Sequence, residues 1–424
     1  DLLSVGGELR RLLLENLTRV CDRIARGQVP ENVRDMVFGS WLVAVSKPSG
    51  GLRPIAVGGV LRRLAAKVML TRVRGGAAAY LSPRQLGFAT RGGAEIAVHA
   101  TRTFLADSER AVMLKIDFKN AFNSHRRDTM LKQVHERFPE IYPIVSQTYC
   151  WPTPIALGDS VIQSRSGCQQ GDVFSPLLFC LVLHGTLESL QSEISLGYLD
   201  DVTLISPDPQ TVIDDIRRIQ EGYSSHGLEI QPSKCEVFVQ GFSSEEQEEI
   251  CGRVMASMPG CRWLADERQV QLLGAPIFGS GISEALLEKS RTYELVFRRL
   301  SHVGSHVAVH ILQRSMGVPR LNYLLRASPA FMATEDLTRL DEQFAAAFES
   351  ILKISLSGDA LIQLSLPTSS GGMGIPTPSG IALSAFAASC NMAEDDVRGL
   401  LGDPSHAVRF LDAATDEFIA KAPY

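Results

Sequence analysis

The chain has 424 residues, too many for one ordinary hydrophobic core, so we expect two or three packed units. Hydrophobic residues make up 45% and charged residues 21%, values typical of a soluble globular enzyme, and no run of eighteen apolar residues exists that could span a membrane. The net charge of −5 is unfavourable for a nucleic-acid enzyme unless positive charge is concentrated locally.

The chain starts at Asp1 without an initiator Met and without the features of a secretory signal. We therefore expect a fragment or a processed product whose upstream or downstream domains are missing. The eight cysteines are scattered and form no C-x-x-C pair, which argues against a zinc ribbon and a disulfide scaffold. Reduced thiols in a nuclear or cytoplasmic protein are the simplest interpretation.

The first quarter of the chain alternates helical and extended patterns. Apolar residues at helical spacing predict a helix over 8–27. Two short apolar runs, 41–45 and 54–57, flank a Pro/Gly turn and predict a hairpin, and a basic helix is expected over 61–73. Between Asp35 and Glu95 nine basic residues occur without any acidic one, so positive charge is concentrated here. A solvated basic face without a partner is the alternative.

The middle of the chain mixes strands and helices irregularly, which predicts an α+β sheet layered with helices. A strand over 111–117 ends in a carboxylate, and residues 195–206 hold two apolar strand halves around a charged pair. The other expected elements are helices over 125–137, 176–190 and 214–224 and strands over 236–239 and 270–274. After residue 283 the pattern is almost entirely helical.

Paired carboxylates on rigid strands are the feature that points to chemistry. Asp117 ends one strand, and Asp200-Asp201 interrupts two apolar strand halves, where a solvated helix face cannot explain the charge. Asp214-Asp215 and Asp395-Asp396, by contrast, can be ordinary acidic faces or starts of helices. Adjacent carboxylates repel one another unless a cation lies nearby, so a metal site is the favoured interpretation and an exposed hairpin turn is the alternative.

A series of segments resembles the ordered motifs of reverse transcriptases, in particular those of non-LTR retrotransposons. The resemblance covers roughly residues 35 to 380. The segments are SKPSGGLRPIAV (46–57), QLGFATRGG (85–93), LKIDFKNAF (114–122), GCQQGDVFSPLLF (167–179), GYLDDVTL (197–204), GLEIQPSKCEV (227–237), LLGAPI (272–277) and LPTSSGGMGI (366–375).

This resemblance implies a polymerase that copies RNA into DNA and has the shape of a right hand. Residues 1–110 are then expected to form the fingers with an N-terminal helical segment. Residues 111–280 would form the palm with its antiparallel sheet, including part of the fingers around 125–165. A helical thumb is expected over 281–355, and a C-terminal extension over 356–424.

The resemblance also assigns catalytic and metal-binding roles to individual residues. It implies that Asp117 and Asp200 hold two Mg²⁺ ions, or Mn²⁺ in their place, with the carbonyl of Phe118 as a further ligand. Two such ions can activate the attacking 3′-hydroxyl and stabilise the leaving oxygen. Asp201 is the second acid of its motif. Lys234 matches the family lysine that is proposed to protonate the pyrophosphate leaving group.

Residues for nucleotide binding follow from the same resemblance. Lys47 and Arg53 match the basic residues that contact the triphosphate. Phe122 matches the aromatic gate that excludes a ribose 2′-hydroxyl, although a simple core position is the alternative. Gln170 and Gly171 match the loop that packs against the incoming nucleotide, where glycine permits close backbone approach.

Residues for template–primer binding are Arg62, Arg63, Leu273 and Gly274. The two arginines lie in the basic stretch and are expected to touch the template backbone, with plain surface charge as the alternative. Leu273 and Gly274 lie in the fifth motif. The expected partners are an RNA template, a DNA or RNA primer and deoxynucleoside triphosphates. No membrane is expected, and the sequence does not indicate the oligomeric state.

Two other functions remain alternatives. An RNA-dependent RNA polymerase is disfavoured by Phe122, because a gate for ribonucleotides leaves room for the 2′-hydroxyl. A maturase-like RNA-binding scaffold without activity is disfavoured by the complete carboxylate set. Departures from the family pattern at Val173-Phe174 and Gln231 remove no catalytic group but put the fine placement of primer and nucleotide in doubt.

Overall fold

The computed structural model describes residues 6–46, 50–402 and 408–421. The chain forms two compact units. The first comprises residues 1–91, 113–237 and 249–262, and the second comprises residues 92–112, 238–248 and 263–424. None of the helices within the described ranges is long and apolar enough to cross a membrane. The predicted boundaries of fingers, palm and thumb stay a prediction.

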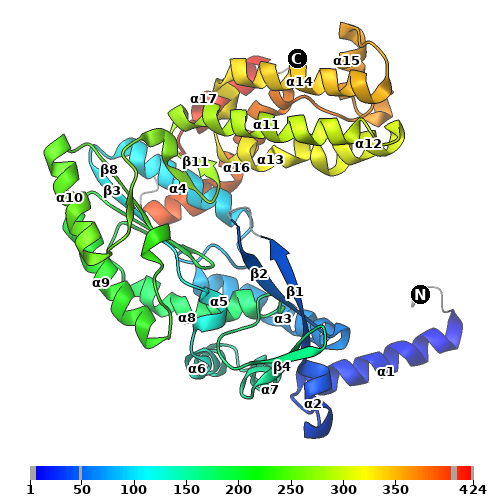
Figure 1. The fold of residues 1–424 in the computed structure, drawn as a ribbon, viewed down its shortest axis with the longest axis vertical. Coiled ribbons are helices and arrows are strands. Elements are labelled where there is room, and N and C mark those ends of the chain that lie inside the picture. Colours follow the sequence, from blue (N-terminus) through cyan, green and yellow to red (C-terminus); the bar gives the residue numbers. More distant parts are fainter. Residues whose placement is uncertain (1–5, 47–49, 403–407, 422–424) are drawn as a thin grey trace. The chain divides into compact units, whose positions relative to one another are not determined.

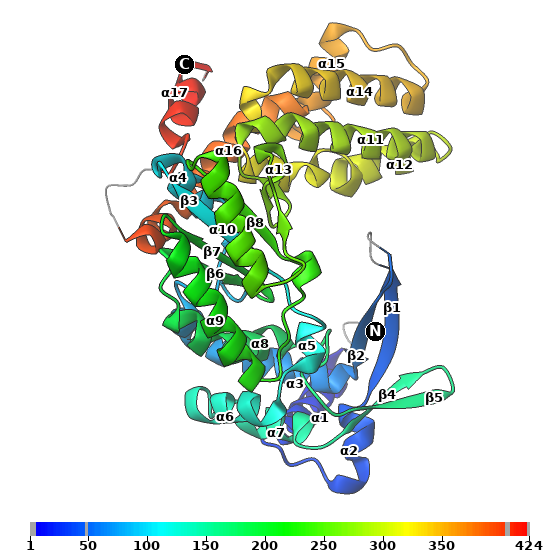
Figure 2. The same ribbon diagram turned by 60° about the vertical axis from the view of Figure 1, so that its left-hand side comes forward.

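The first unit begins with helices α1 (Gly7–Ala25) and α2 (Glu31–Phe38), followed by a four-stranded sheet (Figure 1). The hairpin predicted from two apolar runs is confirmed, and its turn residues 47–49 lie outside the described residues. The first strand of this hairpin also pairs with a second hairpin, and the two hairpins lie side by side in Figure 2. In sheet order the strands are β2 (Leu52–Gly58), β1 (Ser40–Ser46), β4 (Thr153–Leu157) and β5 (Ser160–Ser164).

A five-stranded sheet carries the carboxylates. Its strand order is β6 (Ile194–Tyr198), β7 (Asp201–Ser206), β3 (Ala111–Ile116), β8 (Glu236–Gln240) and β9 (Arg262–Trp263). Strands β3 and β7 are buried almost throughout, as expected for β-branched and apolar runs that are covered on both faces. The mixture of this sheet with long helices confirms the predicted α+β class.

Helices of the first unit pack against one another, and two of them contact strands β6 and β7 of this sheet. The central one, α8 (Ser175–Ser189), is apolar on nearly every side and packs against α3, α6 and α9. The predicted helices are confirmed with shifted ends. In α9, for example, the Asp208 side chain caps a helix start that lies before the one indicated by periodicity. Their bounds are α3 (Val60–Leu81), α5 (Ala121–Ser124), α6 (Arg127–Arg137), α7 (Tyr142–Tyr149), α9 (Pro209–Ser225) and α10 (Ser244–Ser257), whose last residues belong to this unit.

The second unit is mainly helical, as the sequence predicts for residues beyond 283. Its buried helix α4 (Gly93–Asp107) contains Arg102, whose guanidinium donates to the carbonyls of Pro276, Ile277 and Ala327. The remaining elements are β10 (Gln271–Leu272), β11 (Ala275–Pro276), α11 (Ile282–Leu300), α12 (Ser305–Ile311), α13 (Asn322–Ala327), α14 (Thr334–Leu352), α15 (Gly358–Ser365), α16 (Pro378–Leu401) and α17 (Leu411–Lys421).

Candidate active site

The first carboxylate, Asp117, directly follows the buried strand β3. Its backbone carbonyl accepts a hydrogen bond from the Gln231 N–H at 2.8 Å, and the next residue, Phe118, forms a β-bridge with Ile230. The backbone is therefore fixed on both sides of the strand end. The side chain keeps 30% of its surface exposed, so this carboxylate is held rigidly and remains accessible.

The other two carboxylates lie at the tip of the β6–β7 hairpin. Tyr198 pairs with Asp201, so the connecting turn consists of Leu199 and Asp200 alone. Strand β7 is the neighbour of β3 in the sheet. The structure thus confirms the predicted hairpin around the charged pair and brings it close enough to Asp117 for the three carboxylates to interact electrostatically.

Burial and the neighbouring negative charges change the pKa of the two carboxylates at the hairpin tip. Desolvation and the neighbouring charge of Asp117 raise the pKa of Asp200 above its usual value. Desolvation, and then the charges of Asp200 and Asp117, raise the pKa of Asp201 to about 6, although its side chain still reaches solvent. A cluster in which charge is held at this cost has a strong electrostatic affinity for a cation.

Two basic side chains face the carboxylates. The ammonium group of Lys234, in the short 3₁₀ helix Pro232–Lys234, lies 3.2 Å from the carboxylate of Asp117. Arg53, exposed on strand β2, is close enough for its charge to lower the pKa of Asp200 in part. Lys47, the other predicted triphosphate contact, lies outside the described residues. Two of the three predicted basic residues are therefore at the carboxylate cluster.

The loop at Gln170 and Gly171 packs against strand β2. The Gln170 carbonyl accepts a hydrogen bond from the Ala56 N–H at 2.7 Å. Gly171 has a φ of +111°, and a Cβ atom there would lie 2.8 Å from the Ala56 carbonyl oxygen. Glycine is thus required by the close approach of the protein's own backbone. Contact of this loop with a nucleotide stays a prediction.

Phe122 lies in α5, one turn after the carboxylate strand. Its ring stacks on that of Phe179 from α8, with centroids 4.6 Å apart and planes inclined by 22°. Phe179 is fully buried, whereas Phe122 is only half-buried. The ring is therefore held rigidly from one side and partly open on the other, a geometry that suits the predicted gate and leaves that role to be tested.

The structure corrects the assignment of Arg62 as a template contact. Only 3% of this residue is exposed, because it lies on the face of α3 that packs into the unit. Its guanidinium forms an ion pair with the buried carboxylate of Asp172 and donates to the Phe38 carbonyl at 2.6 Å. Nothing in the sequence around Asp172 indicates this pairing. Arg62 therefore joins structural elements, while Arg63 on the same helix is exposed.

A second correction concerns Asp215, which the sequence places on an ordinary acidic face. This residue is fully buried in α9. Its carboxylate accepts hydrogen bonds from the backbone N–H groups of Gln191 and Ser192 at 2.7–3.0 Å and from Arg218 at 2.7 Å. It therefore holds the chain segment that leads into β6.

Leu273 and Gly274 belong to the second unit. They form the two-residue turn between β10 and β11, and both have positive φ angles, 49° and 80°. The Leu273 carbonyl accepts a hydrogen bond from the Tyr323 hydroxyl at 2.9 Å. The turn is thus a defined structure, and its contact with template and primer stays a prediction.

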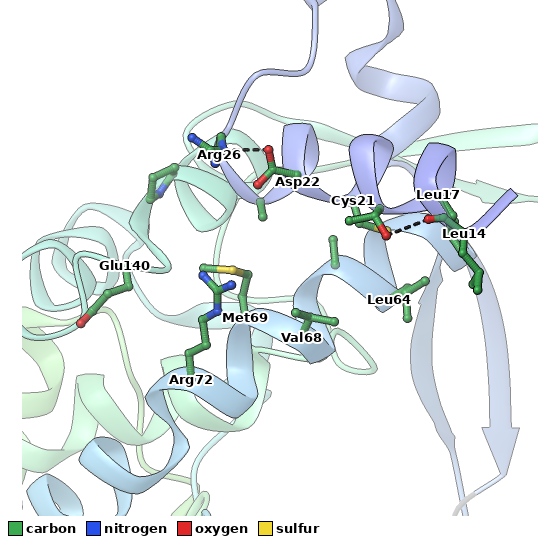
Figure 3. A pocket seen from close by; sticks show the side chains of 14 residues that line it. Leu14, Leu17, Cys21, Asp22, Arg26, Leu64, Val68, Met69, Arg72 and Glu140 are labelled. Atoms are coloured by element: carbon green, nitrogen blue, oxygen red, sulfur yellow. Dashed lines mark hydrogen bonds and ion pairs between the residues drawn. The ribbon is translucent and has the colours of Figure 1, made fainter. Parts of the chain in front are cut away.

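A cavity of about 610 Å³ lies between α1 and α3 of the first unit (Figure 3). Its lining is mainly apolar, with Leu14 and Leu17 from α1 and Leu64 and Met69 from α3, and it includes the Arg26–Asp22 ion pair. None of the sequence-predicted site residues lines it. This cavity therefore has no place in the carboxylate chemistry.

The buried imidazole of His125 makes the stability of the fold depend on pH. Its Nε2 atom accepts a hydrogen bond from the Cys168 N–H at 3.1 Å. Burial lowers the pKa of His125 to about 4. The unfolded chain takes up this proton near pH 6.5 and the folded chain only near pH 4, so the stabilisation is complete above pH 6.5 and is lost as the pH falls through this window.

We expect His125→Gln to flatten this pH dependence by up to about 3 kcal/mol between pH 7 and pH 4.5. Urea unfolding at both pH values measures the effect. The exposed His135 on α6 provides the control, since His135→Gln should keep the wild-type slope. An unchanged slope in His125→Gln would show that the imidazole is protonated at its ordinary pKa.

The carboxylate cluster suits a hydrated divalent cation better than a closed metal site. Within the described residues no group of three or more His, Cys, Asp or Glu side chains could enclose an ion. Mg²⁺ usually keeps several waters and binds through one or two carboxylates together with substrate phosphates. Asp117 and Asp200, with raised proton affinity at the second, are a donor set of this open kind.

The family described as reverse transcriptase (RNA-dependent DNA polymerase) matches residues 45–277 of the chain. All predicted site residues lie within this range. The retrotransposable element SLACS 132 kDa protein of Trypanosoma brucei gambiense is 25% identical over 374 residues, which is 85% of this chain. The chain spans 30% of the length of that relative.

Two solved telomerase structures are also similar. Telomerase from Candida albicans, in complex with a fragment of telomeric RNA, is 11% identical with a TM-score of 0.46. The match covers 97% of this chain and 66% of the telomerase chain. Apo telomerase from Candida tropicalis is 14% identical with a TM-score of 0.35, and the match covers 49% of this chain and 51% of the telomerase chain.

Proposed function

Because the chain belongs to the reverse transcriptase (RNA-dependent DNA polymerase) family, we propose that it extends a DNA or RNA primer on an RNA template with deoxynucleoside triphosphates. The observation that carries this proposal is the cluster of Asp117, Asp200 and Asp201 on adjacent strands, with raised proton affinity at the hairpin tip. A scaffold that only binds RNA gains nothing from carboxylates that repel one another. The similarity to a retrotransposable element supports an origin in such an element.

Asp117 and Asp200 would hold two Mg²⁺ ions, which Mn²⁺ can replace, with the carbonyl of Phe118 as a further ligand. When bound, such ions lower the pKa of the attacking hydroxyl and stabilise the charge on the leaving oxygen. The chain's own residues then bind, orient and donate protons. Asp201 adds negative charge to the cluster at the start of β7.

Basic residues complete the proposed reaction. Arg53, on β2, would bind the triphosphate as a bidentate phosphate ligand, together with Lys47. Lys234 is held at 3.2 Å from Asp117, where it would donate a proton to the pyrophosphate as this group leaves. Gln170 would pack against the incoming nucleotide from the loop that contacts β2.

Template binding is assigned to the exposed face of α3. Arg63, Lys67 and Arg74 are all exposed, and their spacing puts them along one stripe of the helix. None of the three forms an ion pair with a described residue. A stripe of uncompensated positive charge fits the phosphate backbone of a nucleic acid. Fingers, palm and thumb, over the residue ranges given above, are the proposed subdivision.

Primer extension on a poly(rA)/oligo(dT) duplex with Mg²⁺ tests the function, comparing dTTP with UTP. We expect the wild type to use dTTP. Phe122→Ala should raise the use of UTP relative to dTTP by roughly tenfold or more, because the half-buried ring no longer occupies the space of the 2′-hydroxyl.

Phe122→Tyr is the control, since it keeps the ring and should keep the preference for dTTP. An active Phe122→Ala variant with the wild-type preference would assign Phe122 to the core. Tight duplex binding without any extension by the wild type would contradict the polymerase and favour the RNA-binding scaffold.

A further inference from the structure

The turn that carries Asp200 contains a residue in an unfavourable backbone conformation. Leu199 has a φ of +55°, in the left-handed region that side chains with a Cβ atom rarely adopt. This residue immediately precedes Asp200 in the two-residue turn of the β6–β7 hairpin. The conformation persists only if surrounding structure stabilises it, and the position of the Asp200 carboxylate depends on it.

The side chain of Gln85 provides that stabilisation. The Leu199 N–H donates to its Oε1 atom at 2.9 Å, and its Nε2 atom donates to the Leu199 carbonyl at 3.3 Å. One amide thus pairs with both backbone groups of the residue with positive φ. Oε1 also accepts from the Gly87 N–H at 3.0 Å. Gln85 is fully buried, so these bonds do not compete with water.

Backbone bonds fix Gln85 relative to the hairpin. The Gly197 N–H donates to the Arg84 carbonyl at 2.7 Å, and the Leu86 N–H donates to the Gly197 carbonyl at 2.8 Å. Gln85 and Gly197 form a parallel β-bridge through these bonds. Residues 84–86 therefore run beside β6, which is the edge strand of its sheet, and deliver the amide to the turn.

Two glycines provide the space for this contact. A Cβ atom on Gly87 would lie 2.3 Å from the Leu199 nitrogen, and one on Gly197 would lie 2.6 Å from Nε2 of Gln85. Both distances are shorter than any real contact of a Cβ atom. The two chain segments are therefore shaped to let the amide reach the turn.

We propose that Gln85 is a positioning residue for Asp200: it clamps Leu199 in the left-handed conformation and so holds the carboxylate in place to bind the metal ion. This inference rests on the proposed polymerase function, since it takes Asp200 to be a metal ligand. Loss of such an indirect support typically lowers metal affinity or activity about 10- to 100-fold.

Gln85→Met tests the clamp, because methionine has a similar length and forms no hydrogen bond to the turn. Gln147 supplies a matched control: its side chain also accepts from a backbone N–H and donates to the carbonyl of one residue, Val29, at 3.2 and 3.1 Å. The readouts are kcat for addition of one dTMP, Mn²⁺ affinity measured by electron paramagnetic resonance, and the melting temperature.

We expect Gln85→Met to lower kcat and Mn²⁺ affinity about 10-fold or more, and Gln147→Met to lower only the melting temperature. Leu199→Gly, which adopts a positive φ without strain, should reduce the kcat loss caused by Gln85→Met. A loss of the same size in the Leu199→Gly background would overturn the clamp.

Equal losses of melting temperature in the two glutamine variants, with unchanged kcat and Mn²⁺ affinity, would also overturn it. If the wild type fails to extend a primer, the proposed function fails separately. The Mn²⁺ affinities of Gln85→Met and Gln147→Met then decide for or against the clamp by themselves.

Discussion

Replacing Asp200 by Asn is expected to lower kcat for primer extension by at least about 1,000-fold, because stabilisation by metal ions contributes several kcal/mol to the transition state. The amide keeps the shape of the side chain and removes the charge that a divalent ion needs. Single-turnover extension of an RNA-templated primer measures the loss. Mn²⁺ affinity should fall in parallel, since Asp117 alone remains of the two proposed carboxylate ligands.

The same substitution should leave the fold intact or stabilise it. Desolvation and repulsion from Asp117 raise the pKa of Asp200 in the folded chain. A raised carboxyl pKa means that ionisation disfavours the folded state at neutral pH and that this penalty is relieved as the pH falls through the folded pKa. Asp200→Asn removes the penalty, so its melting temperature at pH 8, without metal, should equal or exceed that of the wild type.

Asp214→Asn provides the matched control, because Asp214 is a partly exposed carboxylate on α9 that pairs with Arg217. It should keep wild-type activity and Mn²⁺ affinity. An Asp200→Asn variant that extends primers at a rate near that of the wild type would remove this carboxylate from the metal site. A large drop in its melting temperature would instead mean that Asp200 has a structural role.

The carboxylate cluster could be predicted from the sequence because local patterns determine most of it. An apolar strand before Asp117, and two apolar strand halves around Asp200-Asp201, indicate where the carboxylates stand on strands. The position of the turn that joins the two halves was also predictable, because the charged pair interrupts the apolar pattern there. The contact of Gln85 with Leu199 was not, because it joins residues 114 positions apart through bonds that no pattern encodes.

Arg62 and Asp215 were misassigned because a charged residue in a sequence carries no sign of its burial. For Arg62 a signal existed: Ala65, Ala66 and Met69 follow it at helical spacing and are all buried. Its partner Asp172, however, is 110 residues away, and only the fold brings the two together. Helical periodicity could therefore have placed Arg62 on the inner face without explaining what neutralises it.

Arg62→Met is expected to destabilise the first unit by about 3–5 kcal/mol, because it leaves Asp172 as an uncompensated buried charge. Urea unfolding measures this loss. The double variant Arg62→Met, Asp172→Leu should recover part of it, since an apolar pair of similar volume needs no ion partner. Failure of the double variant to recover stability would mean that the other hydrogen bonds of the two side chains, from Arg62 to the Phe38 carbonyl and from the Phe174 N–H to Asp172, contribute more than the ion pair.

Arg63→Met, the same substitution one position further along α3, should have the opposite profile. Arg63 is exposed, so its removal should change stability by no more than about 0.5 kcal/mol. Affinity for an RNA–DNA duplex, measured by fluorescence anisotropy at several salt concentrations, should fall, and the salt dependence should decrease by about one phosphate contact. A stable Arg62→Met variant with that same binding defect would mean that Arg62 does contact the template. If Arg62→Met instead binds the duplex like the wild type, only Arg63 of the two adjacent arginines faces the nucleic acid.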